Sequence, residues 1–456
     1  MADFPLWQSG LREEYPQLRG EKHTDVAIVG GGLTGASCAA SLASSGAKVI
    51  LLEAGRMGRG ASWNCTGKVT AQLGGVYATV DQTIGRRAAA AYAALMLHAV
   101  DAVGRLVREL DIPCRLREQS VYVFAETPAE VSALQELHTL ERSLGLPVSI
   151  APDAGGCPFP VELSLVMERQ LLLQPEPYLL GLLRHAAQSG ATLHERTPVQ
   201  AIEGHRLISP TGSVTAEHII LATGSPLGCT SLPRLAMLQQ RTCAAVTLSL
   251  PAPQHHSHLS ARADELTLRP CAEGAVLAWD LGRTGTDEHA QRSAVLDRTL
   301  RQLLPEAKVL EQSIRQDVWS GDGLPLIGPV RADQPHLLMA TGYSGWGVAN
   351  SHLAAEVLTG AILGKPHPQA HLFRPDRRYP GHARVMLREG LNIGKAYAGG
   401  LFRRSAPHCP HMGGRLRYNA DAARWECPCH GSTFTVMGQP LDAPADHPAR
   451  VSARQR

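Results

Sequence analysis

The stretch DVAIVGGGLTGASCAASLASSGAKVILLE, residues 25–53, decides the fold of this chain. It opens with a short β-branched apolar run at residues 25–29, which is typical of a buried strand. The spacing G-x-G-x-x-G follows at once, then small helix-compatible residues at 36–45. A second apolar run at residues 48–52 ends at Glu53. Together these features predict a βαβ unit of about thirty residues, and hence a Rossmann-like α/β domain.

Each glycine of this unit has a physical reason to be there. Gly30 permits the tight turn after the strand, and Gly35 allows close packing of helix on strand. Gly32 lets the backbone approach a pyrophosphate at the helix N-terminus, where free N–H groups favour an anion. Glu53 would accept hydrogen bonds from ribose hydroxyls. The predicted dinucleotide-binding residues here are Gly30, Gly32, Leu33, Thr34, Gly35 and Glu53. The alternative is a glycine-rich turn that binds nothing.

Composition describes a globular protein. Its 456 residues have room for about three domains, 44% of them are hydrophobic, and the net charge of +3 is too small to indicate nucleic-acid binding. No run reaches the ~18 apolar residues of a membrane span, and residues 1–20 lack the apolar region of a signal peptide. Seven of the ten cysteines are scattered singly, which fits a reducing compartment. We therefore expect a cytoplasmic protein.

Two boxes near the end of the sequence carry metal-ligand chemistry. The first is Cys409-Pro410-His411, and after fifteen residues the second reads CPCHGS at 427–432. One cysteine and one histidine per box suit a Rieske [2Fe–2S] centre, in which two thiolates hold one iron and two imidazoles hold the other. The predicted ligands are Cys409 and Cys427 on one iron, and His411 and His430 on the other. A zinc knuckle and a degenerate, empty site are the alternatives.

Four further glycine-containing motifs lie between these regions. RMGRGAS at 56–62 and TGKVTAQ at 66–72 follow the ribose acid, HIILATG occupies 218–224, and TGYSGWGVA occupies 341–349 after an apolar run. In this order they resemble the FAD oxidoreductases of the D-amino-acid oxidase, glycine oxidase and sarcosine oxidase superfamily. With the C-terminal boxes, the chain resembles the members of that superfamily that carry a C-terminal Rieske domain.

The resemblance implies the architecture. Residues 1–379 form the FAD-dependent oxidoreductase, with nucleotide-binding parts at about 22–85, 165–230 and 315–365. An α+β substrate domain with a mixed sheet is inserted at about 86–164 and 231–314, and residues 380–456 form a small all-β Rieske module. It also implies further FAD-binding residues: Ala61, Ser62, Val199, Ala222, Thr223, Gly224, Gly342, Gly345, Trp346 and Gly347.

The same resemblance implies the reaction. FAD would accept a hydride from the carbon next to nitrogen in an amine or amino acid, and electrons would pass to the cluster and on to an external acceptor, either a soluble carrier or a quinone. No acid or base is named with certainty, because a deprotonated amine needs no strong base. Lys68, Tyr343 and Trp346 are weak catalytic candidates, and each has a purely structural alternative. Arg269 is either a substrate-carboxylate ligand or a surface arginine.

Differences from the resembled Rieske domains concern the cluster. The usual disulfide between the boxes would start at Gly414, so Cys429 lacks that partner, and Phe434 stands where high-potential members have a tyrosine. Both differences favour a lower potential. Ser432 matches the hydroxyl that bonds a bridging sulfide, and Pro444 the proline of the shielding loop.

Two other functions stay open. A Rieske oxygenase would need a mononuclear iron on two histidines and a carboxylate, and Asp333 and His336 supply half of one common spacing. A flavin/Fe–S redox sensor or electron-transfer protein would have no amine substrate of its own.

Overall fold

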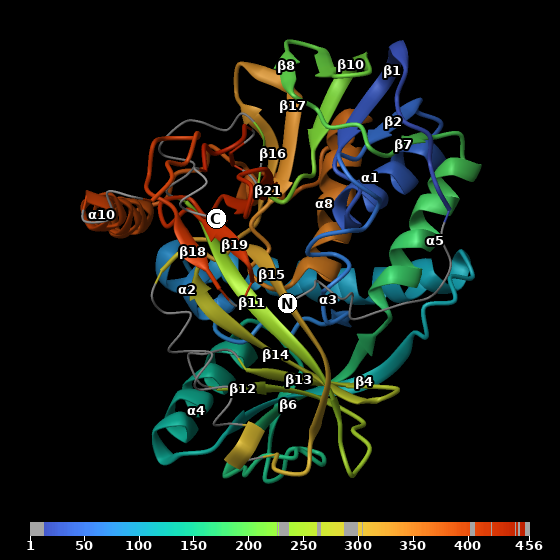
Figure 1. Cartoon of the computed structure of the whole chain (residues 1–456). Coiled ribbons are helices and arrows are strands. Elements are labelled where there is room, and N and C mark those ends of the chain that lie inside the picture. The colour runs from blue at the N-terminus through green and yellow to red at the C-terminus, as the bar shows by residue number, and fades with distance from the viewer. Residues whose placement is uncertain are drawn as a thin grey trace.

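The computed structural model describes residues 13–225, 227, 237–261, 266–286, 300–302, 304–401, 406–420, 422–442, 444–445 and 447–451. Three sheets organise these residues. Figure 1 shows the first sheet at the top, the second below it, and the small third sheet at the left beside both. Eight helices pack around them: α1 (Leu33–Ser44), α2 (Val76–Thr83), α3 (Arg86–Glu109), α4 (Pro128–Ser143), α5 (Pro175–Gln188), α8 (Gly347–Ile362), α9 (Ala370–Phe373) and α10 (His382–Leu401).

The first sheet contains the predicted βαβ unit. Its order is β16 (Leu326–Arg331), β17 (Gln334–Thr341), β10 (Gly212–Leu221), β1 (Gly20–Val29), β2 (Val49–Leu52) and β7 (Thr192–His194), with β8 (Ala201–Glu203) and β9 (Arg206–Ser209) attached to β10. The pairs from β17 to β7 along this path are parallel. The last four residues of β1 are buried, because α1, α5 and α8 cover one face and a second apolar cluster covers the other. The Rossmann-like prediction is confirmed.

The second sheet is mixed and nine-stranded. Its order is β15 (Lys308–Ser320), β11 (Leu238–Ser249), β14 (Gly274–Arg283), β13 (Thr267–Cys271), β12 (Ser257–Ser260), β4 (Arg117–Ala125), β6 (Leu163–Leu172) and β3 (Lys68–Val69), with β5 (Val148–Ala151) beside β6. The strand pairing takes β3, β6 and β15 into this sheet, although the sequence boundaries placed all or part of these strands with the nucleotide-binding parts.

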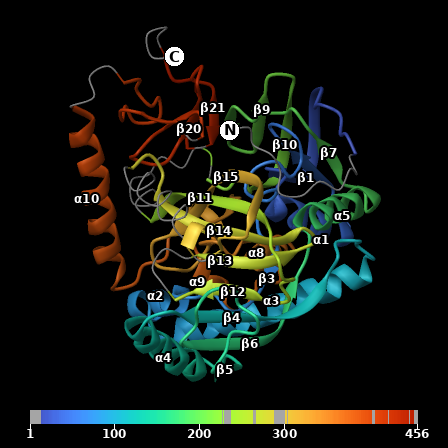
Figure 2. The same cartoon turned by 60° about the horizontal axis from the view of Figure 1, so that its bottom comes forward.

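The C-terminal module has one helix and four short strands. The strands are β18 (Arg417–Asn419), β19 (Arg424–Glu426), β20 (Thr433–Thr435) and β21 (Pro440–Asp442), all antiparallel. The helix α10 precedes them, so the segment expected to be all-β begins with a helix. Figure 2 shows α10 running along one flank, from the oxidoreductase to the module.

Among the described helices, only α3 is long and apolar enough to cross a membrane by length and composition. Half of that apolar window is buried inside the protein. The helix packs against α2 and α8, and its Tyr92 donates a hydrogen bond to Asn350 Oδ1 of α8 over 3.0 Å. These contacts are those of a core helix.

A buried ion network ties the end of β15 to the start of α10. The Asp322 carboxylate accepts hydrogen bonds from Arg377 at 2.7 and 2.8 Å and from His382 at 2.9 Å. All three side chains are buried. Burial opposes the charge on Asp322, but Arg377 and His382 outweigh it and hold its pKa well below the usual range. Breaking a buried pair of this kind typically costs about 3–5 kcal/mol.

A second buried acid, Glu141, has few polar contacts. Glu141 of α4 is fully buried, accepts one hydrogen bond from Gln72 Nε2 at 2.8 Å, and has no partner for Oε1. Burial raises its pKa from 4.5 to about 8. The folded protein therefore holds a proton here that the unfolded chain releases, so this group destabilises the fold as pH rises from about 4.5 through about 8.

We expect Glu141→Gln to remove that dependence, because glutamine mimics the protonated carboxyl. Each pH unit across the window is worth at most about 1.4 kcal/mol. Thermal unfolding of wild type and variant at several pH values measures the difference, with Glu136→Gln on the exposed side of the same helix as control. Parallel curves for wild type and Glu141→Gln would contradict this account.

Candidate functional site

The turn between β1 and α1 has no room for side chains. A Cβ at Gly30, where φ is +109°, would lie 2.5 Å from the Ala222 carbonyl oxygen. A Cβ at Gly35 would lie 1.9 Å from the Gly30 oxygen. Ala222 N also donates to Val29 O at 2.8 Å, so the two predicted motifs lie side by side. Thr223 and Gly224 follow in the same turn.

The second glycine-rich loop closes over the start of α1. Ser62 Oγ accepts the Leu33 N–H at 2.9 Å, and a Cβ at Gly32 would lie 2.9 Å from the same oxygen. Glu53 accepts the N–H groups of Gly31 at 2.7 Å and Gly55 at 2.8 Å. Burial raises the pKa of the Glu53 carboxyl, although these bonds oppose the shift. Ala61 is exposed on this loop and Val199 is partly buried against the opposite face of the first sheet.

The third glycine-rich turn joins this region from the other side. Thr341 Oγ1 donates to Gly224 O, and Gly342 and Gly345 adopt φ of +78° and +89°. Trp346 caps α8, which begins at Gly347. The Tyr343 hydroxyl lies 3.0 Å from Thr34 Oγ1 of α1. The turn therefore brings the N-termini of α1 and α8 together.

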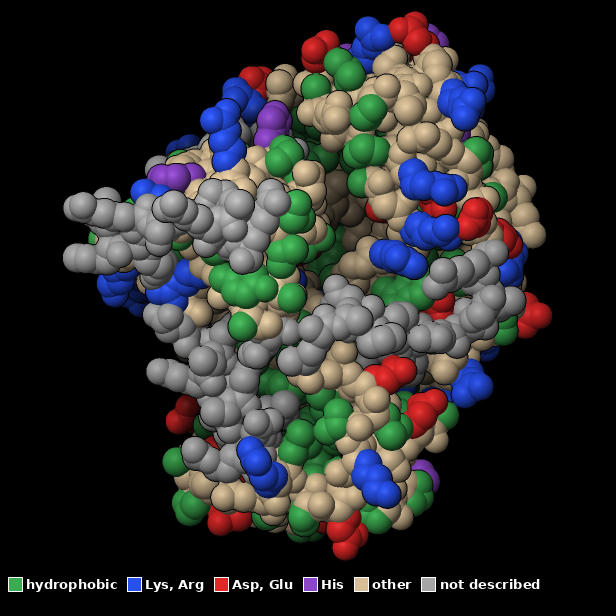
Figure 3. Space-filling model, in the orientation of Figure 1, with side chains coloured by type: hydrophobic (Ala, Val, Ile, Leu, Met, Phe, Trp, Pro, Cys, Tyr) green, Lys and Arg blue, Asp and Glu red, His purple; other side chains and the backbone are tan. Residues whose placement is uncertain are grey.

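These residues fit FAD. Neither α1 nor α8 has an acidic residue in its first turn, so both helix N-termini favour negative charge. The glycines of the β1–α1 turn leave bare backbone where a phosphate would approach. Figure 3 shows a hollow between the Rieske module and the first sheet, with Lys and Arg side chains along its rim.

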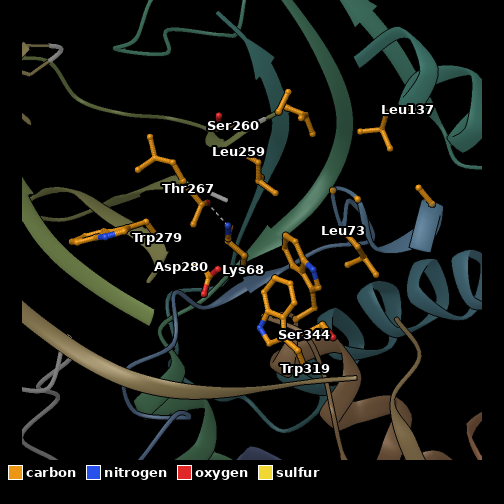
Figure 4. A pocket seen from close by; sticks show the side chains of 18 of the residues that line it. Lys68, Leu73, Leu137, Leu259, Ser260, Thr267, Trp279, Asp280, Trp319 and Ser344 are labelled. Atoms are coloured by element: carbon orange, nitrogen blue, oxygen red, sulfur yellow. Dashed lines mark hydrogen bonds between the residues drawn. The ribbon is translucent and has the colours of Figure 1, made fainter. Parts of the chain in front are cut away.

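A cavity of about 520 Å³ lies between this turn and helices α2 and α4. Lys68 and Trp346 line it, whereas Tyr343 does not and instead packs against α1. Lys68 Nζ donates to Thr267 Oγ1 and lies 5.3 Å from the centre of the Trp346 ring. Figure 4 shows Lys68, Thr267 and Asp280 together at one end and Leu73 and Leu137 at the other.

Strand β15 adds charged groups that sequence reasoning missed. Arg315, Asp317 and Trp319 alternate along it and all line the cavity. Burial raises the pKa of the Asp317 carboxyl, and Arg315 beside it opposes the shift. Asp280 on β14 bonds Arg241, whose guanidinium lies 4.6 Å from the Trp319 ring centre. No local motif marks these residues; only the alternation of a strand facing a pocket could have indicated them.

The interpretation of Arg269 as a surface arginine is wrong. Its side chain is buried and does not line the cavity. The guanidinium donates to the carbonyl oxygens of Thr66, Leu173 and Pro270. Burial lowers its pKa to about 9. Arg269 therefore holds the loop that carries Lys68, because three backbone carbonyls converge on it.

The two cluster boxes fold into matching loops. Cys409 N donates to Gly414 O at 2.8 Å, and Cys427 N donates to Ser432 O at the same distance. Gly413 and Gly431, both with positive φ, donate back to Cys409 O and Cys427 O at 2.9 Å. Both cysteines are buried, and their side chains are hydrogen-bonded to each other. The loops thus present one thiol pair and one imidazole pair.

The donor set fits a two-iron cluster. The rings of His411 and His430 lie 5.1 Å apart. His430 is buried, yet neither ring nitrogen has a hydrogen-bond partner, which is costly unless a ligand takes them. Among the described residues, no three His, Cys, Asp or Glu side chains form a group for one metal ion. A [2Fe–2S] centre needs only two protein ligands per iron.

The structure also places the residues around the boxes. Ser432 is fully buried, with its hydroxyl hydrogen-bonded to Cys409 and to Ala445 N. A Cβ at Gly414 would lie 2.6 Å from Cys429 Sγ, and Cys429 is free. Phe434 is fully buried in the module's core, and Pro444 is partly buried near the loops.

The second box rests on the oxidoreductase. Gln316 Nε2 of β15 donates to Gly431 O at 2.6 Å. A Cβ at Gly431 would lie 2.0 Å from Gln240 Cβ of β11, and one at Gly285 would lie 2.7 Å from Pro428 N. Gly285 N also donates to Glu426 Oε2 at 3.0 Å. These contacts place the loop of His430 against the edge strand of the second sheet.

Comparison with known families agrees with this geometry. The family model described as FAD dependent oxidoreductase matches residues 25–361, and the Rieske [2Fe-2S] domain model matches residues 378–453. Among curated proteins, the "Putative Rieske 2Fe-2S iron-sulfur protein YhfW" of Bacillus subtilis is 28% identical, over 96% of this chain and 94% of the relative. The glycine oxidase of Bacillus licheniformis is 23% identical, over 76% of this chain and 94% of the relative.

Solved structures share the fold of the larger part. Glycine oxidase from Geobacillus kaustophilus superimposes with a TM-score of 0.66 at 22% identity, covering 78% of this chain and 99% of that one. L-proline dehydrogenase from P. horikoshii gives 0.64 at 16% identity, covering 78% and 98%. The chain belongs to the FAD dependent oxidoreductase family, and it carries a Rieske [2Fe–2S] domain behind the oxidoreductase part.

Proposed function

We propose that this oxidoreductase oxidises the C–N bond of a small amine or amino acid and that the electrons leave through the Rieske cluster to an external acceptor. FAD when bound supplies a two-electron hydride acceptor, and the cluster supplies one-electron transfer. The product carbon–nitrogen double bond is then hydrolysed by water. We place this reaction in a reducing cytoplasm, because singly scattered cysteines are typical of that compartment.

The proposal rests mainly on β15, which contacts the cavity with one face and the cluster loop with the other. Side chains on a strand alternate between its two faces. Arg315, Asp317 and Trp319 line the cavity, whereas Gln316, between them, points away and binds the backbone of Gly431, next to the predicted ligand His430. One strand therefore separates the cavity from the cluster loop, which supports transfer of electrons within the chain.

The lining of the cavity supports a substrate rather than a sensor role. Charged groups on two strands, Lys68 of β3 and Arg315 and Asp317 of β15, face the same space. Groups of both charge signs beside aromatic and aliphatic side chains suit a small polar substrate. Lys68 and Trp346 lie beside the glycine-rich turn, so we propose that they position the substrate amine near the flavin.

Anaerobic addition of a good amine substrate tests the proposal directly. We expect the flavin absorbance to bleach first and the electron paramagnetic resonance signal of a reduced Rieske cluster to grow afterwards. Bleaching with an unchanged cluster would refute the electron route. Failure of every amine to bleach a fully loaded protein would instead favour the sensor or electron-transfer alternative.

The variant Gln316→Glu should slow the second step alone. A carboxylate cannot donate to Gly431 O and places negative charge against that carbonyl. We expect docking of the loop to weaken by about 1–3 kcal/mol, the cost of one buried hydrogen bond, so the reduced cluster appears more slowly after unchanged bleaching. Stopped-flow absorbance combined with freeze-quench spectroscopy measures both steps.

Gln312→Glu is the matched control, because Gln312 lies four residues earlier on the same face of β15 and does not line the cavity. It introduces the same charge away from the cluster loop. Equal slowing by both variants would mean that the Gln316–Gly431 contact has no special part in the transfer.

A further inference from the structure

The charge of the chain is concentrated in one short segment. Residues 378–417 contain eight Lys or Arg and a single acid, Glu389, and therefore carry +7, whereas the whole chain carries +3. The remainder is thus net negative. A charge asymmetry of this size indicates an anionic partner for the segment.

Helix α10 makes up half of this segment, and its inner face is occupied. Val385 packs against Gly321, with its Cγ1 2.5 Å from where a Gly321 Cβ would lie. Glu389 is buried and bonds Arg283 and Gln239 of the second sheet. Ile393 and Tyr397 pack on the core of the Rieske module. The one acid of the segment is therefore hidden, and the exposed cation with which it pairs is Arg388, at 3.0 Å.

The outer face of α10 is apolar and fringed with positive charge. Leu387 is 65% exposed and Leu391 57% exposed, one turn apart on the same side. Among the described side chains of the helix, small residues accompany them on that line: Ala383, Gly390, Gly394 and Ala398. Arg384 and Lys395 are exposed along one edge. A basic helix with exposed leucines has the composition of helices that lie in a membrane interface.

The apolar surface continues to the cluster. The Tyr397 hydroxyl of α10 donates to the backbone oxygen of Met412, whose side chain is 42% exposed. Met412 directly follows the predicted ligand His411. The exposed Met412 side chain therefore lies beside the C-terminal part of α10, next to His411.

We propose that this surface, consisting of the outer face of α10 with Met412, docks on an anionic lipid membrane. Figure 2 shows α10 at the edge of the molecule as a convex ridge, which suits a flat partner. Leu387 and Leu391 would enter the apolar boundary while Arg384 and Lys395 extend to the headgroups. A second copy of this chain would bring two like-charged edges together, and it would not neutralise them.

The consequence concerns the electron acceptor and rests on the proposed function. Docking in this orientation brings the His411 side of the module to the membrane surface. An acceptor dissolved in the lipid, of the quinone class, would then meet the cluster without a soluble carrier.

Vesicle co-sedimentation of the full holoenzyme tests the docking. We expect binding to phosphatidylcholine vesicles that contain phosphatidylglycerol, weak binding to phosphatidylcholine alone, and release by high salt. Leu387→Gln with Leu391→Gln should lower the affinity about tenfold through lost apolar contact. Arg384→Gln with Lys395→Gln should lower it about fivefold per charge.

Matched controls lie elsewhere on the surface. Val309→Gln with Leu310→Gln removes two half-exposed apolar side chains from β15, and Arg105→Gln with Arg142→Gln removes two exposed cations from α3 and α4. These should bind like wild type. Equal losses in controls and α10 variants, or wild type remaining in the supernatant, would overturn the proposal.

Light scattering of the same variants tests whether a second copy of this chain, rather than a membrane, covers the outer face of α10. A wild-type dimer that the Leu387→Gln, Leu391→Gln variant dissociates would show that a second copy covers this face, and would also overturn the proposal. The vesicle assay needs no substrate, and the anaerobic amine assay needs no vesicles. Failure of the docking is thus distinguished from failure of the proposed oxidation.

Discussion

The seating of the Rieske loop on β15 is the constraint on which the functional arrangement depends. Gly431 lies so close to Gln240 that no side chain fits between them, and Gln316 holds the loop by its backbone. The same strand supplies Arg315, Asp317 and Trp319 to the cavity. Moving the module away would therefore disturb the wall of the cavity as well as the path between the two redox sites.

Buried ion pairs at α10 help to set the position of the module. Asp322 holds Arg377 and His382 at the start of the helix, and Glu389, about two turns further along, holds Arg283. Such pairs are sensitive to geometry, because each charge is costly if its partner moves. They specify one orientation of the helix, while the apolar contacts of Ile393 and Tyr397 fasten the module to it.

Local spacing accounts for what could be predicted from the sequence. The β1–α1 turn and the two cluster loops are built by residues a few positions apart, so the motif itself carries the geometry, as in the matching bonds of Cys409 and Cys427. The cavity charges were missed because Arg315 and Asp317 join Lys68 only through pairing of distant strands. The burial of Arg269 was not predicted for the same reason. Two of its carbonyl partners, those of Thr66 and Leu173, lie about two hundred and about one hundred residues away in the sequence. The third belongs to the neighbouring residue, Pro270.

The missing disulfide can be understood from the same contacts. The loops keep the spacing that a bond would require, since a Cβ at Gly414 would lie 2.6 Å from Cys429 Sγ. A disulfide stabilises a small module mainly by restricting its unfolded chain. Here the β15 edge, the Gly285–Glu426 bond and α10 restrict the module instead. Docking on the oxidoreductase thus replaces the conformational restriction that a disulfide would provide, so the module can stay folded without one. The same docking also positions the cluster loops.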